Sequence, residues 1–572
     1  MAVESPQRSE NLQRTAGSRL LKKLKHYGIK ALKKMVLLPK SKIMPSDCIS
    51  YQDSGYFIPL MQDYLNQNPA LANFYHRFPT LENFEAQFKE KQLHFTDTHR
   101  EVLVSALKKQ YAAVETTSKT AQNIDALLQP NTFTVTTGHQ LNLFTGPLYF
   151  LYKIISTINL TNELKAKYPN QNFVPIYWMA TEDHDFDEIN YFNYKGKKLR
   201  WNVESSGPVG RHSTEGLGEI LKVFEKEIGN SSNAQFIKNL FEASYVRHES
   251  LTEATRYLAN VLFGKNGLVI LNGDDAALKK EFAPFIKEEL LQQTSHREVT
   301  ATIEELKIYD IQVNPRDINL FYIENTVRER IILENGIYKI NNTSLAFSEA
   351  EILALLATHP EKFSPNVMLR PLYQEVILPN LCYIGGGGEL AYWLELKSFF
   401  EAVKVPFPML LLRNSALIAT QKQAQKADKL GLTWKDLFSR QHDLVHRKAK
   451  LFSEFPIDLS IQKAHLINQF HYLHVLAHQT DRSFAGAVKA QEAKQLRGLE
   501  NLEKRLLKAQ KKKYENELDR IIDLQNQLFP HGSLQERLAN FAEFYIDNGT
   551  SLIEKMFAEL EPLDQKFTIL IF

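Results

Sequence analysis

The sequence predicts an α/β fold with a parallel-sheet core, followed by a long helical segment. Three observations lead to this prediction. Residues 133–179 read as strand, helix and strand, the pattern of a parallel βαβ unit. Polar clusters follow both strands, at the carboxyl ends where open parallel sheets bind ligands. Beyond residue 415 the composition stays helical for most of the remaining chain.

Length and composition narrow the class of protein. A chain of 572 residues is too long for one compact core, so two or more domains are expected. We find no apolar run long enough to span a membrane and no signal peptide. Cys48 and Cys382 stand outside any CxxC or zinc spacing, so we predict no disulfide framework, no structural metal and a reducing, cytoplasmic setting.

The charge is unevenly distributed. Residues 1–43 carry eleven Lys or Arg and two Asp or Glu, so the rest of the chain has a net charge of −6 although the whole has +3. The negative net charge of residues 44–572 argues against nucleic acid as a partner. We interpret residues 1–43 as a disordered basic extension or an upstream start; the alternative is a basic amphipathic helix that associates weakly with an anionic membrane.

The stretch from Thr136 to Lys153 is the first candidate site. A β-branched run enters a turn that contains Gly138 and Gly146, and an apolar helical pattern leaves it at Leu148. In this order backbone N–H groups and a helix N-terminus converge on an anion or polar ligand; the alternative is an ordinary βα loop. The candidate residues are Thr137, Gly138, His139, Gln140, Asn142, Thr145, Gly146 and Lys153. His139 follows Gly138 at a strand end, so we expect it to face the ligand rather than the core.

A second polar cluster follows the apolar run that ends at Met179. Its candidates are Trp178, Glu182, Asp183, His184, Asp185 and Glu188. We interpret them as hydrogen-bond acceptors for an amine or polyhydroxylated substrate, or as a general base. Carboxylates with a histidine also suit a divalent cation, but a lone histidine without an HExxH pattern makes a metal the less favoured interpretation, and a helix cap is another. No GxSxG motif supports a Ser–His–Asp hydrolase.

Three further strand ends carry candidate binding residues. One follows residues 267–271, a second precedes four consecutive glycines, and a third closes residues 408–412. The glycines free the backbone to approach a ligand, although a tight packing turn explains them equally well, and the run matches no nucleotide fingerprint. The candidates in this part of the chain are Asp274, Arg370, Gln374, Gly385, Gly386, Gly388, Glu389, Tyr392 and Arg413.

The periodicity divides the chain into successive segments. Residues 44–190 contain a helical prelude and the first half of the core. The segments that follow are a β-rich insertion at 191–233, core at 234–304, a second insertion at 305–360, core at 361–414, helices at 415–530, and helices with a strand at 531–572. The second insertion contains Asn335–Gly336, a strong hairpin signal. Residues 483–528 have a seam typical of a coiled coil, for which we predict an antiparallel partner in 415–450 and dimerisation. We expect the strand at 567–572 to return to the core sheet.

Several motifs together resemble the BshC family, the cysteine-adding enzymes of bacillithiol biosynthesis. They are Thr137-Gly138-His139-Gln140, Leu143 to Tyr149, Trp178, Glu182 to Asn190, Leu378-Pro379-Asn380, Ile384-Gly385-Gly386, Gly388-Glu389 and Ala391 to Lys397. The resemblance implies a Rossmann-like core similar to class I aminoacyl-tRNA synthetases and nucleotidylyltransferases. It also implies two connecting-peptide insertions, at 191–233 and 305–360, and a coiled-coil domain that forms a homodimer.

The same resemblance implies the activity of a carbon–nitrogen ligase. It would attach L-cysteine through its carboxyl group to the amine of glucosaminyl malate, giving bacillithiol. ATP, with Mg²⁺, is expected to activate the carboxyl group, and ADP near the coiled coil also fits the family. We expect His139, Asp183, His184 and Asp185 to be the catalytic residues, because they follow predicted strand ends.

Gly138–Gln140 corresponds in placement to the HIGH motif of the synthetases, where histidine stabilises phosphates. This sequence departs from that motif, with one histidine instead of two, no KMSKS-like loop and only Arg413 in its place, which leaves the mode of activation open. The alternative function is a non-catalytic coiled-coil scaffold that binds nucleotide.

Overall fold

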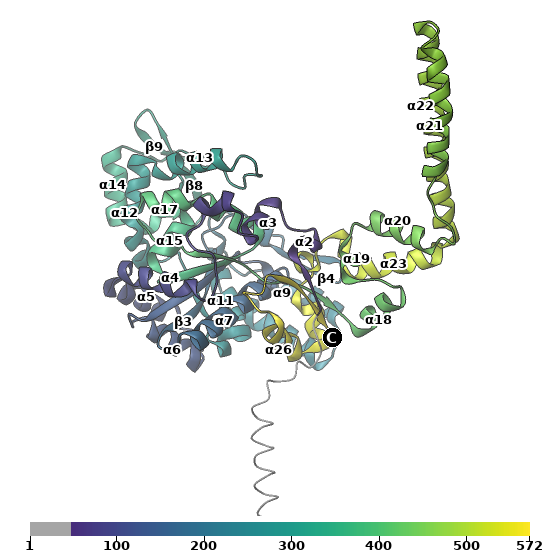
Figure 1. The fold of residues 1–572 in the computed structure, drawn as a ribbon. Coiled ribbons are helices and arrows are strands. Elements are labelled where there is room, and N and C mark those ends of the chain that lie inside the picture. Colours follow the sequence, from purple (N-terminus) through teal and green to yellow (C-terminus); the bar gives the residue numbers. More distant parts are fainter. Residues whose placement is uncertain (1–46) are drawn as a thin grey trace, which may run out of the picture. The chain divides into compact units, whose positions relative to one another are not determined.

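The computed structural model describes residues 47–572, so the predictions for residues 1–43 lie outside the described part of the chain. The core of the fold drawn in Figure 1 is a parallel sheet, whose strand order is β13-β12-β2-β3-β6. The bounds are β2 Thr132–His139, β3 Asn172–Met179, β6 Val269–Asn272, β12 Asn380–Gly385 and β13 Met409–Leu412. Read from β6, this is the 3-2-1-4-5 order of a Rossmann-like fold, whose topological switch point lies between β2 and β12. The predicted α/β core with a parallel sheet is confirmed.

The core strands are buried on both faces, as parallel sheets require. Every residue of β2 is buried. Helices cover the sheet: α7 (Tyr149–Lys167) connects β2 to β3, α4 (Asn83–His94) packs on β12, and α5 (Asp97–Gln110), α6 (Ser118–Ala126) and α11 (Leu251–Phe263) contact β6. Two buried hydroxyls of β2 are satisfied across the switch point, because Thr136 donates to Asn380 Oδ1 at 2.8 Å and Thr137 to the Ile384 carbonyl at 2.7 Å.

The second insertion forms an antiparallel sheet of its own, with the order β10-β9-β8-β7-β11. Its strands are β7 Leu320–Glu324, β8 Val327–Glu334, β9 Ile337–Ile340, β10 Ala346–Phe347 and β11 Phe363–Pro365, with α14 (Glu349–Thr358) between the last two. The predicted hairpin at Asn335–Gly336 is confirmed. Both residues have positive φ, 53° and 79°, as the tight turn between β8 and β9 requires.

The β-rich prediction for residues 191–233 is correct only at the start of that segment. β4 (Tyr191–Tyr194) and β5 (Lys197–Arg200) form a hairpin, but α9 (Leu217–Ile228) and α10 (Ser232–Phe241) follow. The buried residues of α9 are Leu217, Leu221, Phe224 and Ile228. Their spacing of three and four is helical, and this signal outweighs the short alternating runs before it.

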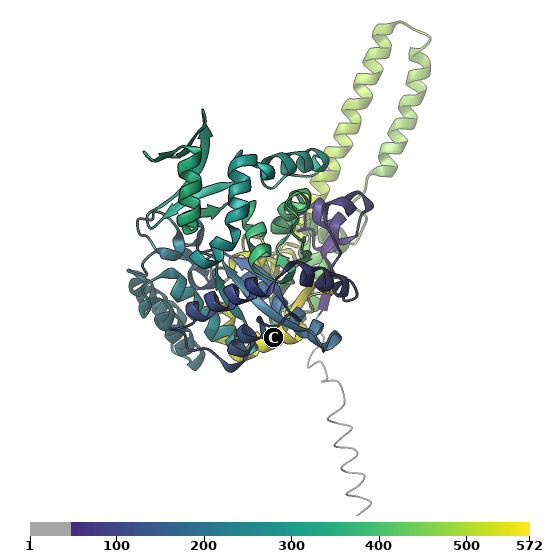
Figure 2. The same cartoon turned by 90° about the vertical axis from the view of Figure 1, so that its left-hand side faces the viewer.

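The C-terminal part is helical, and the predicted partner of the long seam is correct only for the C-terminal end of the seam. The seam forms α22 (Arg482–Lys513) and α23 (Glu515–Leu528), separated at Tyr514. Along most of α22 the antiparallel partner is α21 (Ser460–Ala477), which lies beside α22 in Figure 2. An ion pair between Lys463 and Glu503 at 2.6 Å and a hydrogen bond between His474 and Glu492 at 2.8 Å fix the antiparallel register. From the predicted range, α20 (Gln441–Phe452) packs on α22 and α23, and Gln441 donates to Asn526 at 2.9 Å, so this end of the seam has the predicted partner.

The C-terminal strand also differs from the prediction. β15 (Lys566–Ile571) lies between β1 (Asp47–Ser50) and β14 (Ser415–Ala419) in a separate three-stranded sheet. The sequence did not predict β14 as a separate strand, because β14 begins only three residues after β13 ends. The helices before β15 do return to the core, where the Asn540 side chain donates to the carbonyls of Phe144 and Gly146. Within residues 47–572, no helix combines the length and apolarity needed to cross a membrane.

A buried ion pair joins α4 to α15 (Leu369–Ile377). Lys91 Nζ lies 3.0 Å from Glu375 Oε2, and both side chains are almost fully buried. Gln374 and Asn380 donate to the other carboxylate oxygen at 3.0 Å and 2.6 Å. The carboxylate therefore has partners on both oxygens, and removal of Lys91 would leave one of them unpaired in the interior.

We predict that Lys91→Met lowers the free energy of unfolding by about 3 kcal/mol, because an uncompensated buried charge is strongly destabilising. Urea denaturation measures the change. Lys89→Met is the matched control on the same helix, since Lys89 pairs with Glu85 at the surface and should contribute less than about 1 kcal/mol. Equal effects of the two substitutions would refute the structural role of the buried pair.

Candidate active site at the ends of the core strands

A cavity of about 850 Å³ lies at the carboxyl ends of the core strands. The polar clusters after β2, β3 and β12 meet there, although they are far apart in the sequence. The predicted residues that line it are Gly138, His139, Gln140, Lys153, Trp178, Glu182, Asp183, His184, Asp185, Arg370, Gly386, Gly388, Glu389, Tyr392 and Arg413. This is the position at which open α/β sheets bind ligands.

An ion pair joins the two strands at the switch point. Lys153, from the second turn of α7, contacts both carboxylate oxygens of Glu389 at 2.8 Å and 2.7 Å, and it donates to the Gly138 carbonyl at the end of β2. Glu389 belongs to the first turn of α16 (Gly387–Leu394), where it also accepts the Gly386 N–H at 2.7 Å and the Tyr383 hydroxyl at 2.8 Å. Both charges are therefore engaged, and Lys153 is not available to bind an anion.

The environment of Glu389 keeps it ionised. Burial acts to raise its pKa, but the Lys153 ammonium and the hydrogen bonds from Gly386 and Tyr383 outweigh burial and lower the pKa to about 2. Gly385 is required beside this pair, because a Cβ there would lie 2.9 Å from the Tyr383 ring. The glycine run thus serves close packing around Glu389 as well as lining the cavity.

His139 is buried beside this pair and lines the cavity. Burial first, and then the charge of Lys153, lowers its pKa to about 3, so the imidazole is neutral near pH 7. Nε2 is buried without a hydrogen-bond partner among residues 47–572, whereas a hydrogen bond with the Thr145 backbone involves the other nitrogen. A neutral ring of this kind does not supply positive charge to a phosphate, and its second nitrogen has no hydrogen-bond partner within residues 47–572.

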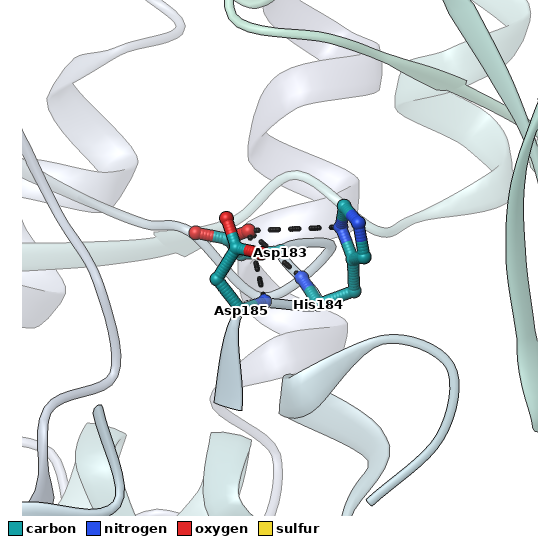
Figure 3. Close-up of side chains that lie close together, drawn as sticks. All are labelled: Asp183, His184 and Asp185. Carbon is teal, nitrogen blue, oxygen red and sulfur yellow. Dashed lines mark hydrogen bonds and ion pairs between the residues drawn. The ribbon is translucent and has the colours of Figure 1, made fainter. Parts of the chain in front are cut away.

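The acidic wall of the cavity is a tight turn after β3 (Figure 3). Asp183 Oδ1 accepts the backbone N–H groups of His184 and Asp185 at 2.8 Å and 3.4 Å. Asp183 Oδ2 accepts the Gln140 amide at 2.9 Å, and the same amide donates to Glu188 at 2.9 Å. Asp183 therefore holds the turn, while the Asp185 carboxylate has no hydrogen-bond partner within the described part of the chain.

The turn offers three ligand atoms that a cation could use, from Asp183, His184 and Asp185, all within 4.8 Å of one another. Two observations argue against a resident metal. Arg328 Nη1 lies 2.6 Å from His184 Nδ1, so this nitrogen accepts a hydrogen bond and faces a positive charge. Asp183 Oδ1 is occupied by backbone donors. The donor set fits a hydrogen-bonded turn better than a metal site.

A network behind the turn fixes Glu182. Lys279 on α12 (Ala276–Gln292) is buried and contacts Glu182 at 2.6 Å and Asp274 at 3.4 Å. Asp274 in turn receives two hydrogen bonds from Arg211, at 2.8 Å and 2.9 Å. Asp274 was predicted to bind ligand, but its carboxylate is outside the cavity and acts on the site through Lys279.

Other predicted site residues also lie outside the cavity. They are Thr137, Asn142, Thr145, Gly146, Glu188, Gln374 and Gly385. The turn at 142–146 does not present its N–H groups to a ligand: Phe144 N–H donates to the Tyr245 hydroxyl at 2.8 Å, and Gly146 N–H to the Leu143 carbonyl at 2.9 Å. Gln374 accepts from Arg370 at 3.2 Å and so helps to hold that cavity residue. Of the predicted site from Thr136 to Lys153, residues 142–146 therefore do not offer these donors to a ligand, because the Tyr245 hydroxyl and the Leu143 carbonyl occupy them.

Sequence reasoning missed several residues that line the cavity: Tyr149, Arg316, Arg328, Arg330, Tyr383 and Arg537. Arg328 and Arg330 carried a usable signal, since two arginines two positions apart lie on one face of a strand. Tyr383 was a polar ring inside an apolar strand. Nothing in the sequence distinguished Arg316 or Arg537 from surface arginines.

The two halves of the chain match two family descriptions. Residues 44–414 match "Bacillithiol biosynthesis BshC, N-terminal Rossmann-like domain", and residues 416–572 match "Bacillithiol biosynthesis BshC, C-terminal coiled-coil domain". The chain belongs to the BshC family. The resemblance noted from the motifs is thereby confirmed over almost the whole chain.

Similar proteins in this family are named "Putative cysteine ligase BshC". The protein of Flavobacterium johnsoniae is 62% identical over 92% of this chain and 100% of its own length. That of Christiangramia forsetii is 57% identical over 92% and 99%, and that of Bacillus thuringiensis is 28% identical over 87% and 96%. The chain is accordingly an enzyme of the ligase class, which argues against a non-catalytic scaffold.

A solved structure described as a putative arginyl-tRNA synthetase from Campylobacter jejuni aligns with 77% of this chain and 95% of its own. The identity is 14% and the TM-score is 0.20. A similarity this weak supports no conclusion, so the likeness of the core to synthetases stays a prediction.

The buried neutral His139 makes a prediction about stability and pH. Above pH 6.5 the imidazole is neutral in the folded and the unfolded chain and contributes no pH dependence. Below pH 6.5 the unfolded chain gains a proton that the folded chain takes up only near pH 3, so stability falls with pH by about 1.4 kcal/mol per unit. We expect His139→Asn to lack this loss. Urea denaturation at pH 6 and at pH 5 gives the difference in the free energy of unfolding between wild type and variant. We expect this difference to be about 1.4 kcal/mol smaller at pH 5 than at pH 6.

The exposed substitution His359→Asn controls for removing an imidazole. If both variants follow the same pH dependence, the neutral state assigned to His139 is incorrect.

Proposed function

We propose that this enzyme joins the carboxyl group of L-cysteine to the amine of glucosaminyl malate, forming an amide and completing bacillithiol. The observation that carries the proposal is the cavity at the switch point of a BshC-family chain, with an acidic turn on one wall and arginines on others. An acidic wall suits the amine, and arginines suit the carboxylates that both substrates carry.

The carboxyl group of cysteine must be activated, because amide formation from a free carboxylate is unfavourable in water. We propose ATP as the source of activation, with Mg²⁺ accompanying its phosphates. The residues that fit the phosphates are Gly387 and Gly388 at the start of α16 and Arg537 of α24 (Gln535–Leu538), which all line the cavity. The guanidinium of Arg537 has no ion-pair partner among residues 47–572, whereas Arg413 is paired with Glu536 at 2.7 Å. Arg537 therefore suits this role better than Arg413.

The acidic turn supplies a base for the amine. A protonated amine cannot attack, so a carboxylate must take its proton. Asp185 is the carboxylate with a free side chain, since Asp183 is held by His184, Asp185 and Gln140. We assign proton acceptance to Asp185 and positioning of the turn to Asp183. Nε2 of His139 would accept a hydrogen bond from a substrate N–H or O–H group.

We further propose a homodimer formed through α21 and α22. Apolar side chains remain exposed on these helices, among them Ile461, Tyr472, Leu476, Phe484 and Leu502. A second copy of the same hairpin would bury them. We also propose a binding site for ADP near the coiled coil. A cytoplasmic location is proposed because both cysteines of the chain, exposed Cys48 and buried Cys382, are free thiols, as is usual in a reducing compartment.

Product formation tests the proposed function directly. Purified protein incubated with L-cysteine, glucosaminyl malate and ATP should yield bacillithiol, detected by mass spectrometry, and should yield none when ATP is omitted. Consumption of neither substrate under these conditions would refute the proposed activity. Product formed equally well without ATP would refute ATP activation alone.

We predict that Asp185→Asn lowers kcat by about 10²- to 10⁴-fold, the usual contribution of a general base. Circular dichroism should be unchanged, because the Asp185 side chain makes no hydrogen bond within residues 47–572. Asp187→Asn is the matched control, since Asp187 lies two residues away and pairs with Arg200 at the surface. A kcat for Asp185→Asn within threefold of the control would exclude Asp185 as the base.

A further inference from the structure

The second insertion contributes one wall of the cavity, and this wall is positively charged. Its lining residues include Arg316, in the loop before β7, and Arg328 and Arg330, on β8. Within the described part of the chain, no carboxylate of this insertion lines the cavity. The acids nearest in sequence have other partners: Asp317 lies 3.7 Å from His296, and Glu329 accepts the Asn342 amide at 3.2 Å.

Arg328 is fixed in place by the protein. Its guanidinium stacks on the Phe321 ring at 4.0 Å, and it donates to Ser364 Oγ, the Pro365 carbonyl and His184 Nδ1 at 3.2, 3.2 and 2.6 Å. The carboxylates of Glu182, Asp183 and Asp185 lie near enough to act on its charge. Arg328 thus joins the arginine wall to the acidic turn, and its positive charge is largely offset.

Arg316 and Arg330 differ from Arg328. Neither guanidinium has a hydrogen bond or an ion pair to any residue in the range 47–572, although the main chain of both residues is held, Arg316 by Asn319 and Arg330 by Asn341. Arg330 lies opposite Phe321 on the neighbouring strand, so it shares the face of β8 that carries Arg328. The cavity therefore contains two guanidinium groups on ordered backbone whose charges the protein does not neutralise.

We propose that Arg316 and Arg330 form a dicarboxylate-binding subsite that holds the malate moiety of the amine substrate. The inference rests on the proposed function, because glucosaminyl malate is the substrate that carries two neighbouring carboxylates. A guanidinium presents paired N–H donors that match a carboxylate, and two unneutralised guanidiniums match two carboxylates in charge.

The subsite also orients the substrate. With its carboxylates on Arg316 and Arg330, the substrate presents the amine on C2 of the sugar, next to the glycosidic carbon that carries malate, to the acidic turn. Arg328 joins this turn to the arginine wall through His184, and Asp185 is free there. The two walls thus bind the oppositely charged groups that neighbouring carbons of the sugar carry. A glucosaminide with a neutral aglycone would lose the arginine contacts and should be a poor substrate.

Binding of L-malate tests the subsite without catalysis. Isothermal titration of the full chain should show that L-malate binds at least tenfold more tightly than the monocarboxylate L-lactate. Arg316→Gln and Arg330→Gln should each weaken L-malate about 10- to 100-fold, as expected for loss of a charge-assisted contact. Arg297→Gln, which removes an exposed arginine of α13 (Thr294–Leu306), is the matched control and should bind as the wild type does. Equal binding of malate and lactate, or equal binding by all variants, would overturn the proposal.

Steady-state kinetics separate this inference from the proposed function. The wild type should prefer glucosaminyl malate to methyl glucosaminide, and Arg330→Gln should reduce the ratio of the two kcat/KM values about 10- to 100-fold. Arg330→Lys should restore part of this ratio, because it keeps the charge but loses the paired donors. If product forms but the ratio does not change, the subsite is wrong and the function stands. If no product forms although L-malate binding depends on both arginines, the proposed function fails and the subsite stands.

Discussion

The site depends on the ion pair between Lys153 and Glu389. It connects α7 and the end of β2 to the first turn of α16, at the topological switch point of the sheet. A buried pair of this kind is costly to form, and it is compensated because Gly386, Tyr383 and Gly138 satisfy the remaining donors and acceptors. With the strand ends fixed in this way, the crevice at the switch point stays open and polar.

Two sets of charged groups lie in or around the cavity. One set is paired inside the protein: Lys153 with Glu389, Arg413 with Glu536, and Lys279 with Glu182 and Asp274. These pairs position the walls. The other set, Asp185, Arg316, Arg330 and Arg537, has side chains without an ion pair within residues 47–572 and lines the same cavity. Substrates are expected to meet the second set, since its charges are not already neutralised.

The sequence predicted the core well, because buried parallel strands and their glycine-rich ends leave strong local signals. All five core strands and the Asn335–Gly336 hairpin were predicted from apolar runs and turn residues. Residues at strand ends, such as His139 and Asp185, were placed correctly in one cavity for the same reason. The contacts that the sequence did not predict join residues far apart in the chain. They are the pairing of β14 with β15, the packing of α21 on α22, and the hydrogen bond to the Tyr245 hydroxyl that occupies the turn at 142–146.

The roles of charged residues were equally hard to predict. Lys153 and Arg413 were expected to bind ligand, yet their partners, Glu389 and Glu536, are more than a hundred residues away. Arg316 and Arg537 come from a loop and a short helix whose neighbours only the fold defines. Pairing of charges is a property of the assembled structure, so composition and spacing cannot separate a structural charge from a free one.

A crystal structure of the enzyme with glucosaminyl malate would test the central claim most directly. The account predicts that the sugar amine lies within hydrogen-bond distance of Asp185, that the two carboxylates contact Arg316 and Arg330, and that Lys153 and Glu389 remain paired. Glucosaminyl malate bound outside this cavity, or bound with its amine toward the arginines, would contradict it.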